Sequence, residues 1–255
     1  MTDHIEAFRA LHVPGDPLVL FNIWDAGSAR VVAAAGALAI ATGSYGVAEA
    51  QGFKDGEAFA LENALGNLMR ILRVTDLPVS IDLEAGYGDT AQAVGASVAA
   101  ARAAGAAGIN MEDRMPGTVD LLPVPEQAAR LAAATASGLF VNARCDVFRG
   151  KDAAADGPAL IAATLERARA YADAGASGLF VPFLSDVAAI AAICAGSPLP
   201  VNVLWSPPCG DRQALADLGV ARISHGHQPW AAAMAWLGSQ AEAVHGGAVP
   251  PYASL

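Results

Sequence analysis

Residues 104–109 read Ala-Gly-Ala-Ala-Gly-Ile, and three other parts of the chain repeat this pattern. The related segments are Ala-Gly-Ala-Leu-Ala-Ile at 35–40, Ala-Gly-Ala-Ser-Gly-Leu at 174–179 and Leu-Gly-Val-Ala-Arg-Ile at 218–223. Each has the composition of a helix end, a glycine cap and the start of a buried strand. The repeat therefore predicts a chain in which helices alternate with strands.

Eight apolar segments rich in Val, Ile, Leu and Phe extend this pattern over the whole chain, and alanine-rich segments with helical spacing separate them. Alternating strands and helices pair in parallel, and eight such units close into a barrel of roughly 250 residues. No linker interrupts the 255 residues, so we expect residues 1–255 to form a single (β/α)8 (TIM) barrel domain. The predicted strands are Leu18–Ile23, Leu38–Thr42, Val79–Leu83, Gly108–Glu112, Leu139–Ala143, Gly178–Pro182, Pro200–Leu204 and Ala221–Ser224.

The charge balance excludes several classes of partner. The chain has 15 Lys and Arg against 25 Asp and Glu, which gives a net charge of −10. Nucleic acid and anionic membrane surfaces are therefore not expected to bind. A small anionic substrate would need a local metal ion or arginine to overcome this field.

Cysteine use and hydropathy favour a cytoplasmic protein. The three cysteines are odd in number and form no CxxC pair, so neither a disulfide framework nor a zinc knuckle is predicted. The longest apolar run, Val31–Ala41, is much shorter than the ~20 residues that a membrane span needs. We expect no membrane insertion.

Three acidic residues follow the third and fourth predicted strands. Asp82 and Glu84 are two residues apart and so point to one side of a strand end, and Glu112 ends the next strand. Such acids repel one another unless a cation neutralises them. Oxygen ligands without nearby Cys or paired His favour Mg²⁺ or Mn²⁺ over zinc. The alternative is that these acids cap helices or pair with surface lysines.

Four motifs give the chain a specific family resemblance. Asp82-Leu-Glu-Ala-Gly-Tyr-Gly88, Asn110-Met-Glu-Asp113, Asn142-Ala-Arg144 and the segment 22–30 resemble the isocitrate lyase/phosphoenolpyruvate mutase superfamily over nearly the whole chain. The resemblance implies a Mg²⁺ site that chelates a 2-oxo acid. It makes Asp82 the direct ligand, with Glu84 and Glu112 acting through water.

The same resemblance implies roles for residues around the metal site. Arg144 would pair with the substrate carboxylate or the developing enolate, and the Thr42-Gly43-Ser44 turn would bind a carboxylate through backbone N–H groups. Asp55 falls where the family has an acid on a mobile loop. His227 resembles a histidine of the oxaloacetate decarboxylase branch, and Asn202, at the end of the seventh strand, is expected to contact substrate. An ordinary rim salt bridge or hydrogen bond is the alternative for each.

Departures from the family pattern narrow the reaction. Isocitrate-type lyases carry a catalytic Cys soon after the Glu-Asp pair, but residues 114–122 contain neither Cys nor His. Cys145 should point away from Arg144 on an alternating strand, so we predict a buried thiol there. Decarboxylation of an oxaloacetate-like diacid needs no such acid because CO₂ leaves unprotonated. We therefore predict a Mg²⁺-dependent carbon–carbon lyase that acts through a pyruvate enolate.

Two other functions stay open at this point. Phosphonopyruvate hydrolase or mutase chemistry is less favoured, because Thr118 is the only hydroxyl residue in the stretch 115–125. A relative that binds a 2-oxo acid without turnover is the second alternative. An unrelated phosphate-binding barrel is disfavoured because Ser206–Gly210 is a poor phosphate cradle.

The C-terminal segment predicts a helix with an apolar face. Trp230, Met234 and Trp236 have helical spacing within Pro229–Ala243. The family resemblance implies that residues 229–255 pack on a neighbouring subunit in a homodimer or homotetramer. An eighth helix packed on its own barrel would have the same sequence pattern.

Overall fold

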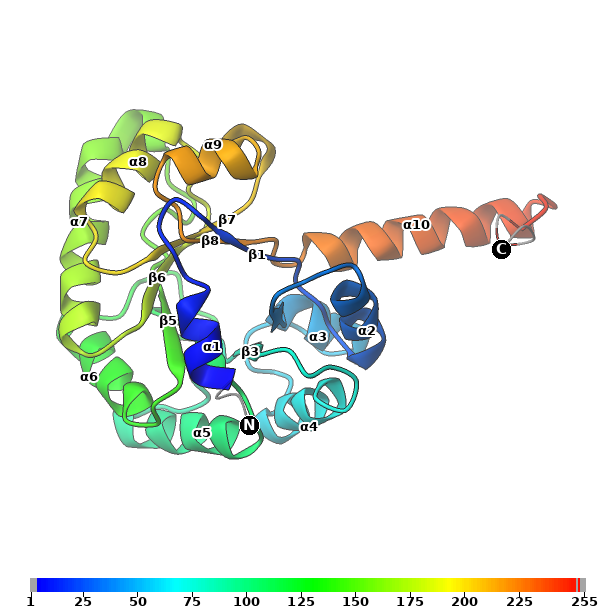
Figure 1. The fold of residues 1–255 in the computed structure, drawn as a ribbon, viewed down its shortest axis with the longest axis horizontal. Coiled ribbons are helices and arrows are strands. Elements are labelled where there is room, and N and C mark those ends of the chain that lie inside the picture. Colours follow the sequence, from blue (N-terminus) through cyan, green and yellow to red (C-terminus); the bar gives the residue numbers. More distant parts are fainter. Residues whose placement is uncertain (1–3, 251, 253–255) are drawn as a thin grey trace.

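The computed structural model describes residues 4–250 and 252, and in them eight parallel strands form a barrel surrounded by helices (Figure 1). The hydrogen-bonded order is β1-β8-β7-β6-β5-β4-β3-β2, and a parallel bridge between Ile23 and Thr42 closes the ring. The strands are β1 (Leu18–Leu20), β2 (Ile40–Ala41), β3 (Val79–Asp82), β4 (Gly108–Glu112), β5 (Phe140–Arg144), β6 (Gly178–Val181), β7 (Val201–Leu204) and β8 (Arg222–Ser224). The predicted single TIM barrel is confirmed.

Helices cover the outside of the barrel between the strands (Figure 1). They are α1 (His4–Ala10), α2 (Ala26–Ala34), α3 (Ser44–Ala50), α4 (Leu61–Ile71), α5 (Ala91–Ala103), α6 (Val124–Thr135), α7 (Ala153–Asp173), α8 (Val187–Gly196), the short 3₁₀ helix η1 (Pro207–Cys209), α9 (Arg212–Asp217) and α10 (Gln228–His245). Side-chain caps fix several starts: Asp25, Thr90, Asp186 and Asp211 each accept a hydrogen bond from the backbone N–H three residues later.

All eight predicted strands occur, but the two at the closing seam are shorter than predicted. β1 ends at Leu20 instead of Ile23, and β2 covers only Ile40–Ala41. The Ile23 N–H donates to the Ala41 carbonyl at 2.9 Å, and the Gly43 N–H donates to the Ile23 carbonyl at 3.3 Å. The segments that follow β1 and β2 are therefore joined by isolated hydrogen bonds and not by a continuous β-ladder.

The strand register decides which side chains share a level inside the barrel. Asp82 on β3 lies opposite Asn110 on β4, and Asn110 lies opposite Asn142 on β5. Because side chains alternate along a strand, Glu112 and Arg144 point to the same side as these asparagines, one level nearer the carboxyl end. The acids and the arginine predicted from sequence are thus brought to one mouth of the barrel.

The opposite end of the barrel is closed by aromatic packing. Phe8 on α1 is fully buried and packs edge-on against Phe140 of β5. His12 stacks on Phe140 with ring centroids 4.0 Å apart, and burial together with the nearby Arg222 lowers the pKa of His12 to about 3. The cavities that contain the predicted acids lie at the other end, where the strands have their carboxyl ends.

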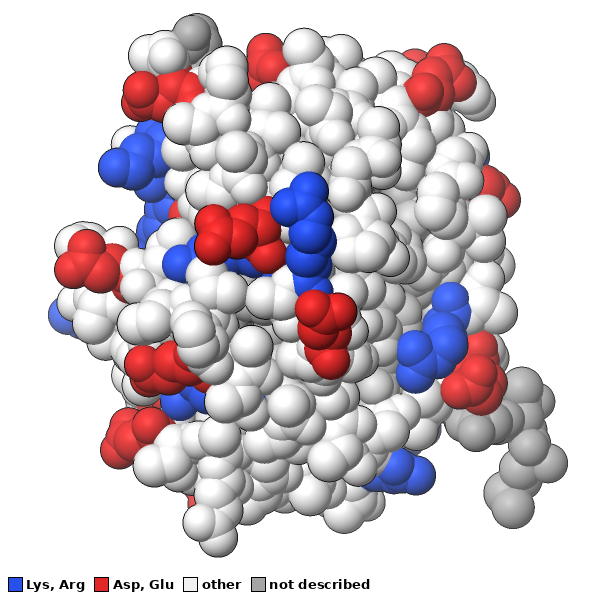
Figure 2. All heavy atoms as spheres, turned by 90° about the vertical axis from the view of Figure 1, so that its left-hand side faces the viewer, with Lys and Arg blue, Asp and Glu red and all other residues white. Residues whose placement is uncertain are grey.

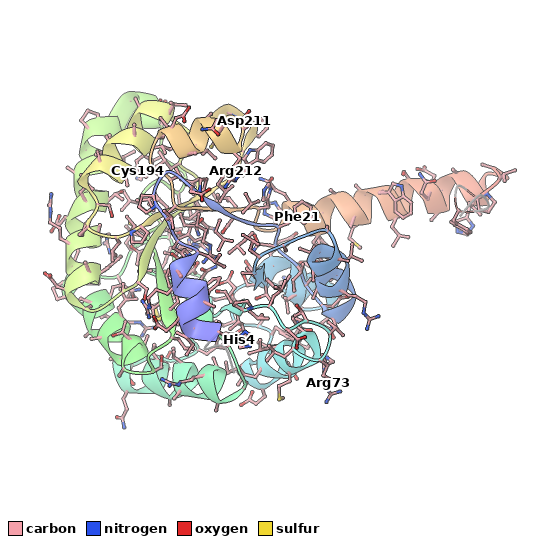
Figure 3. The ribbon with its side chains drawn as sticks, in the orientation of Figure 1. His4, Phe21, Arg73, Cys194, Asp211 and Arg212 are labelled. Atoms are coloured by element: carbon pink, nitrogen blue, oxygen red, sulfur yellow. The ribbon has the colours of Figure 1, made fainter. Side chains whose placement is uncertain are left out.

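Helix α10 extends away from its own barrel (Figure 1). Its face is exposed at Trp236 and Leu237, which are 58% and 53% accessible. The position between α9 and α2 that an eighth helix would cover is instead an apolar groove of about 540 Å³. Phe21 and Arg212 both border this groove and both lie on that open side (Figure 3).

On the face formed by α6, α7 and α8, Lys and Arg lie among Asp and Glu and do not gather into one patch (Figure 2). Among the described residues, every helix is too short or too polar to cross a bilayer.

Candidate active site

Two adjoining cavities open at the carboxyl ends of the strands. One has a volume of about 260 Å³ and is bordered by Asp82 and Asn110, and the other has a volume of about 310 Å³ and is bordered by Glu84 and Glu112. Ser44, Asp55, Arg144 and Arg149 border both cavities. The predicted acids and Arg144 therefore surround one connected region.

Asp82 lies at the centre of this region. Its carboxylate accepts hydrogen bonds from the backbone N–H of Ser44 at 3.3 Å and of Glu84 at 3.2 Å. The Asp82 N–H in turn donates to the Thr42 hydroxyl at 3.0 Å, which ties β3 to the Thr42–Ser44 turn. Burial raises the pKa of Asp82, and Arg144 opposes this effect. A carboxylate in this setting is stabilised by an added cation.

Glu84 holds the loop over the mouth. Its Oε2 accepts hydrogen bonds from the N–H groups of Gly56 and Glu57 at 2.7 and 2.8 Å, and its Oε1 accepts one from the Tyr87 hydroxyl at 3.1 Å. Glu84 has a φ of 49°, a strained left-handed conformation for this residue type. Burial, followed by the charges of Asp82 and Asp55, raises the pKa of Glu84 to about 8.

Arg144 is held between two carboxylates. Its Nη1 lies 2.7 Å from Oε2 of Glu112, and its Nε and Nη2 donate to the two oxygens of Asp146 at 2.6 and 2.9 Å. The pairing with Asp146 is the bidentate geometry that fixes a guanidinium most firmly. Burial raises the pKa of Glu112 to about 7, although Arg144 opposes the rise.

Asp146 is a candidate positioning residue for Arg144 that the sequence analysis did not select. Its side chain is fully buried, and besides Arg144 it contacts Arg149 at 3.4 Å and Arg114 at 3.7 Å. Asp146 stands two residues after Arg144, so strand alternation could have placed it on the same side. Arg149 also borders both cavities, and its guanidinium lies 5.2 Å from the centre of the Phe183 ring.

A second buried network positions Asp146. The Asp113 carboxylate accepts a hydrogen bond from the Asp146 N–H at 2.9 Å, one from the Tyr171 hydroxyl at 2.8 Å and one from Arg167 at 3.2 Å. Asp113 is fully buried, so these donors replace its water. Cys145 is also fully buried in the core, as predicted.

The other predicted site residues differ in where they lie. Gly43 approaches the backbone closely, since a Cβ there would stand 3.3 Å from the Gly226 carbonyl oxygen. Asp55 and His227 border the 260 Å³ cavity. Asn202 is buried, donates to the Ser224 hydroxyl at 3.2 Å, and is not among the described residues that border either cavity. Its role in binding substrate stays a prediction.

The acids fit a cation that keeps part of its water shell. Among the described residues, no three Asp, Glu, His or Cys side chains lie close enough together to bind one ion directly. Mg²⁺ commonly binds through one or two carboxylates and several waters. The region also has the donors for it: three carboxyls with raised pKa values and no lysine among the described residues that border the two cavities. Asp82 as direct ligand and Glu84 and Glu112 as outer ligands suit such an ion.

The model of the phosphoenolpyruvate phosphomutase family matches residues 8–245. The chain belongs to this family. The predicted resemblance to the isocitrate lyase/phosphoenolpyruvate mutase superfamily is thereby confirmed, and the strand ends that carry it are the ones that meet at the cavities.

Individual relatives place the chain within this family without naming one activity. A solved structure from Burkholderia cenocepacia J2315, provisionally described as a phosphonomutase, is 49% identical, covers 94% of this chain and 100% of its own, and superposes with a TM-score of 0.90. The uncharacterized protein Rv1998c of Mycobacterium tuberculosis H37Rv is 36% identical over 98% of this chain and 94% of its own length. The oxaloacetate decarboxylase of Rhodopseudomonas palustris TIE-1 is 32% identical over 90% of this chain and 81% of its own length.

The loop after β4 borders the second cavity beside Glu84 and Glu112. Arg114, Pro116, Gly117 and Thr118 border the 310 Å³ cavity, and Arg114 donates to the Thr118 carbonyl at 2.8 Å. This loop supplies a guanidinium and a hydroxyl to the cavity but no Cys or His.

Proposed function

We propose that this protein is a Mg²⁺-dependent lyase that binds a small 2-oxo acid and stabilises its pyruvate enolate, with decarboxylation or other carbon–carbon cleavage of an oxaloacetate-like diacid as the reaction. The observation that carries the proposal is the position of Arg144. Its guanidinium borders both cavities, of which one is bordered by Asp82 and the other by Glu84 and Glu112. A cation and an arginine at one mouth suit an anionic keto acid in a protein of net charge −10.

Asp82 would hold Mg²⁺ directly, with Glu84 and Glu112 binding through water, and Mn²⁺ could substitute because it accepts the same oxygen ligands. When bound, the ion supplies Lewis-acid stabilisation of negative charge on the substrate oxygens. Glu112 and Asp82 also carry the negative charge that keeps Arg144 protonated. Burial and neighbouring negative charge raise the pKa values of Glu84 and Glu112, and a bound divalent cation would stabilise the ionised form of both acids.

Arg144 and the Thr42–Ser44 turn would bind the substrate anion. The Nη1 atom of Arg144 now contacts Glu112, so a substrate carboxylate can compete for that edge while Asp146 keeps the other edge fixed. Ser44 and Gly43 border the cavity, and the Ser44 N–H now donates to Asp82 at 3.3 Å, so a substrate carboxylate would compete with Asp82 for this donor. Asp55 would close the mouth from its loop.

The reaction type is inferred from the absence of Cys and His in the loop 114–122. Cleavage that releases a carbanion needs an acid, which contributes about 10²–10⁴-fold to such a rate. Loss of CO₂ needs no protonation of the leaving group, so this site can perform it without a cysteine. His227 borders the cavity from the start of α10 and would face the departing carboxylate.

Phosphorus–carbon chemistry is the second candidate function. It is supported by the 49% identity to the provisionally described phosphonomutase and by Arg114 and Thr118 at the cavity, which could bind a phosphoryl group. The same metal acids and Arg144 would serve it.

A panel assay separates these functions. Pyruvate release from oxaloacetate, phosphonopyruvate and substituted malates, and conversion of phosphonopyruvate to phosphoenolpyruvate, would be measured with Mg²⁺ and with EDTA. We expect turnover of an oxaloacetate-like diacid that EDTA abolishes. Release from phosphonopyruvate alone would favour the second candidate, and ligand-induced thermal stabilisation without any turnover would indicate a binding protein.

We also propose that the protein is a homo-oligomer in which α10 of one subunit packs on the next barrel. The apolar groove of about 540 Å³ between α9 and α2 accepts a helix, and α10 leaves its own barrel with Trp236 and Leu237 exposed. Covering both surfaces at once would remove a large apolar area from water. A dimer or a tetramer of such dimers satisfies this arrangement.

A further inference from the structure

A buried arginine inside the barrel takes no direct part in the proposed chemistry. Arg222 on β8 is fully buried, and no described carboxylate lies within ion-pair distance of it. Its Nη2 donates to Oδ1 of Asn110 and its Nε donates to the Ser224 hydroxyl, both at 3.2 Å. Burial lowers the pKa of Arg222 to about 9, with Asp82 opposing the fall, so the guanidinium is protonated at neutral pH.

This arginine fixes which way the Asn110 amide faces. A guanidinium has only donors, so the amide atom turned toward it must be the oxygen. Asn142 supports the same orientation because its Nδ2 donates to the same Oδ1 at 2.9 Å. With two donors on the oxygen, the Asn110 NH₂ group is directed the other way.

The Asn110 NH₂ group is open to the cavity. It makes no hydrogen bond to a described residue, yet it is not among the buried atoms that lack a partner, so it is accessible. Asn110 borders the 260 Å³ cavity together with Asp82 and Arg144. Asp82 is also its direct neighbour in the β3–β4 register. A donor thus points into the cavity beside the proposed metal ligand.

We propose that Asn110 is a substrate-contacting residue whose NH₂ group donates to an oxygen of the bound 2-oxo acid, and that Arg222 is a positioning residue that holds the amide in this orientation. The inference rests on the proposed function. It adds a side-chain amide donor to the acids, Arg144 and the Thr42–Ser44 turn already assigned to the site. A donor that is already oriented before substrate arrives stabilises developing negative charge without having to reorient. The buried Arg222 holds the Asn110 amide in this orientation.

The rival explanation is that Asn110 and Arg222 only fill a polar layer of the barrel core. Asn142 Oδ1, Asn202 Oδ1, Arg222 Nη1 and the Ser80 hydroxyl are buried in this interior without a described partner. A purely structural role predicts that variants lose stability and ligand affinity together, and that a stable variant binds normally.

The test uses oxalate, a planar dianion that resembles the pyruvate enolate, titrated calorimetrically into the Mg²⁺-loaded protein. Asn110→Ala should weaken oxalate binding about 10- to 100-fold, the range for a hydrogen bond to a charged group. Asn110→Asp should weaken it further, because the carboxylate cannot donate and repels the ligand. Pairing with Arg222 should nevertheless keep the Asn110→Asp variant at least as thermally stable as Asn110→Ala. Ser80→Ala, a change in the same interior one strand away, should leave oxalate affinity within about twofold of wild type.

Arg222 is tested by a double-mutant cycle. Arg222→Met should weaken oxalate binding about tenfold in the wild-type background, since the amide is then free to turn. It should cause no further loss in the Asn110→Ala background. If Arg222→Met does not fold, Arg222→Gln, whose amide can present either its oxygen or its nitrogen to Asn110 and so does not fix it, takes its place in the same cycle with the same non-additivity expected.

The outcomes separate this inference from the proposed function. If Asn110→Ala binds oxalate within about twofold of wild type, the role of Asn110 is overturned. Turnover of the diacid by the wild-type protein would in that case still support the proposed function. Equal losses from the Arg222 change in both backgrounds would overturn the positioning role. Failure of wild type both to bind oxalate with Mg²⁺ and to turn over any 2-oxo acid would overturn the proposed function and this inference with it.

Discussion

The guanidinium of Arg144 is held at both edges: Nη1 lies 2.7 Å from Oε2 of Glu112, while Nε and Nη2 bind both oxygens of Asp146. The two partners differ in kind. Asp146 is fully buried and fixed by Asp113, whereas Glu112 borders the cavity. An entering anion can therefore replace Glu112 on Arg144 while Asp146 preserves the orientation.

The Asp146→Asn change tests whether Asp146 holds Arg144 in its orientation. An amide keeps the volume of the side chain but replaces one acceptor oxygen by a donor that faces Arg144, so we expect activity to fall at least about tenfold. Stability should fall by about 1–3 kcal/mol, as for a buried hydrogen-bonded group that loses its partner. Steady-state kinetics and urea unfolding measure the two effects, and wild-type activity in Asp146→Asn would show that Asp146 does not position Arg144.

Arg144→Lys preserves the charge and removes the planar fork. A lysine cannot bind Asp146 through two parallel hydrogen bonds and reach the substrate as well. We expect kcat/KM to fall by about 10²-fold or more, with circular dichroism unchanged. The matched control is Arg149→Lys, which should lose less because Arg149 makes a single 3.4 Å contact with Asp146. Equal losses in the two variants would contradict a special role for Arg144.

Stability of the metal-free protein should fall as pH rises from about 6.5 to 8, above the range in which the lowered pKa of His12 acts in the opposite direction. Burial and neighbouring acids raise the pKa of Glu84 to about 8 and burial raises that of Glu112 to about 7, so in this window the folded state binds more protons than the unfolded chain. Mg²⁺ needs the ionised acids, and its stabilising effect should therefore be larger at pH 8 than at pH 6. Thermal unfolding with Mg²⁺ and with EDTA at both pH values measures this. Glu84→Gln should flatten the pH dependence in EDTA; an unchanged slope would mean that Glu84 is not its source.

The subunit arrangement can be tested at the groove between α9 and α2. Leu38 is 62% exposed and borders this groove, so Leu38→Glu should block a neighbouring helix and shift the protein toward monomer. Met69→Glu on α4 is the control, because Met69 is 49% exposed and does not border the groove. Sedimentation velocity gives the masses. A wild-type monomer, or an oligomer that Leu38→Glu leaves intact, would contradict helix exchange.

The sequence predicted the repeated parts of the fold better than its irregular parts. The glycine-capped segments at 104–109 and 174–179 indicate β4 and β6 because a helix end, a left-handed glycine and a buried strand are all local features. The short strands β1 and β2 were overestimated because their ends depend on how the barrel closes, which no local pattern records. The direction of α10 likewise depends on tertiary packing.

The positions of the site residues could likewise be predicted only where a regular local pattern fixes them. The spacing of Asp82, Glu84 and Glu112 places them at one mouth because strand alternation is regular. Strand alternation places Asp146 on the same side as Arg144, but its support by Asp113, 33 residues away along the chain, is a tertiary contact that no local pattern records. No substrate contact was predicted for Asn110, because a neutral amide does not stand out in the charge pattern. Its orientation depends on Arg222, which comes 112 residues later in the chain.

We propose that Asp82, Glu84 and Glu112 gather a divalent cation beside Arg144. An anomalous difference map from crystals grown with Mn²⁺ and oxalate would locate this ion. We expect a single strong peak next to the Asp82 carboxylate, with Glu84 and Glu112 reaching it through water and oxalate between the ion and Arg144. A peak elsewhere, or none at this mouth of the barrel at saturating Mn²⁺, would contradict it.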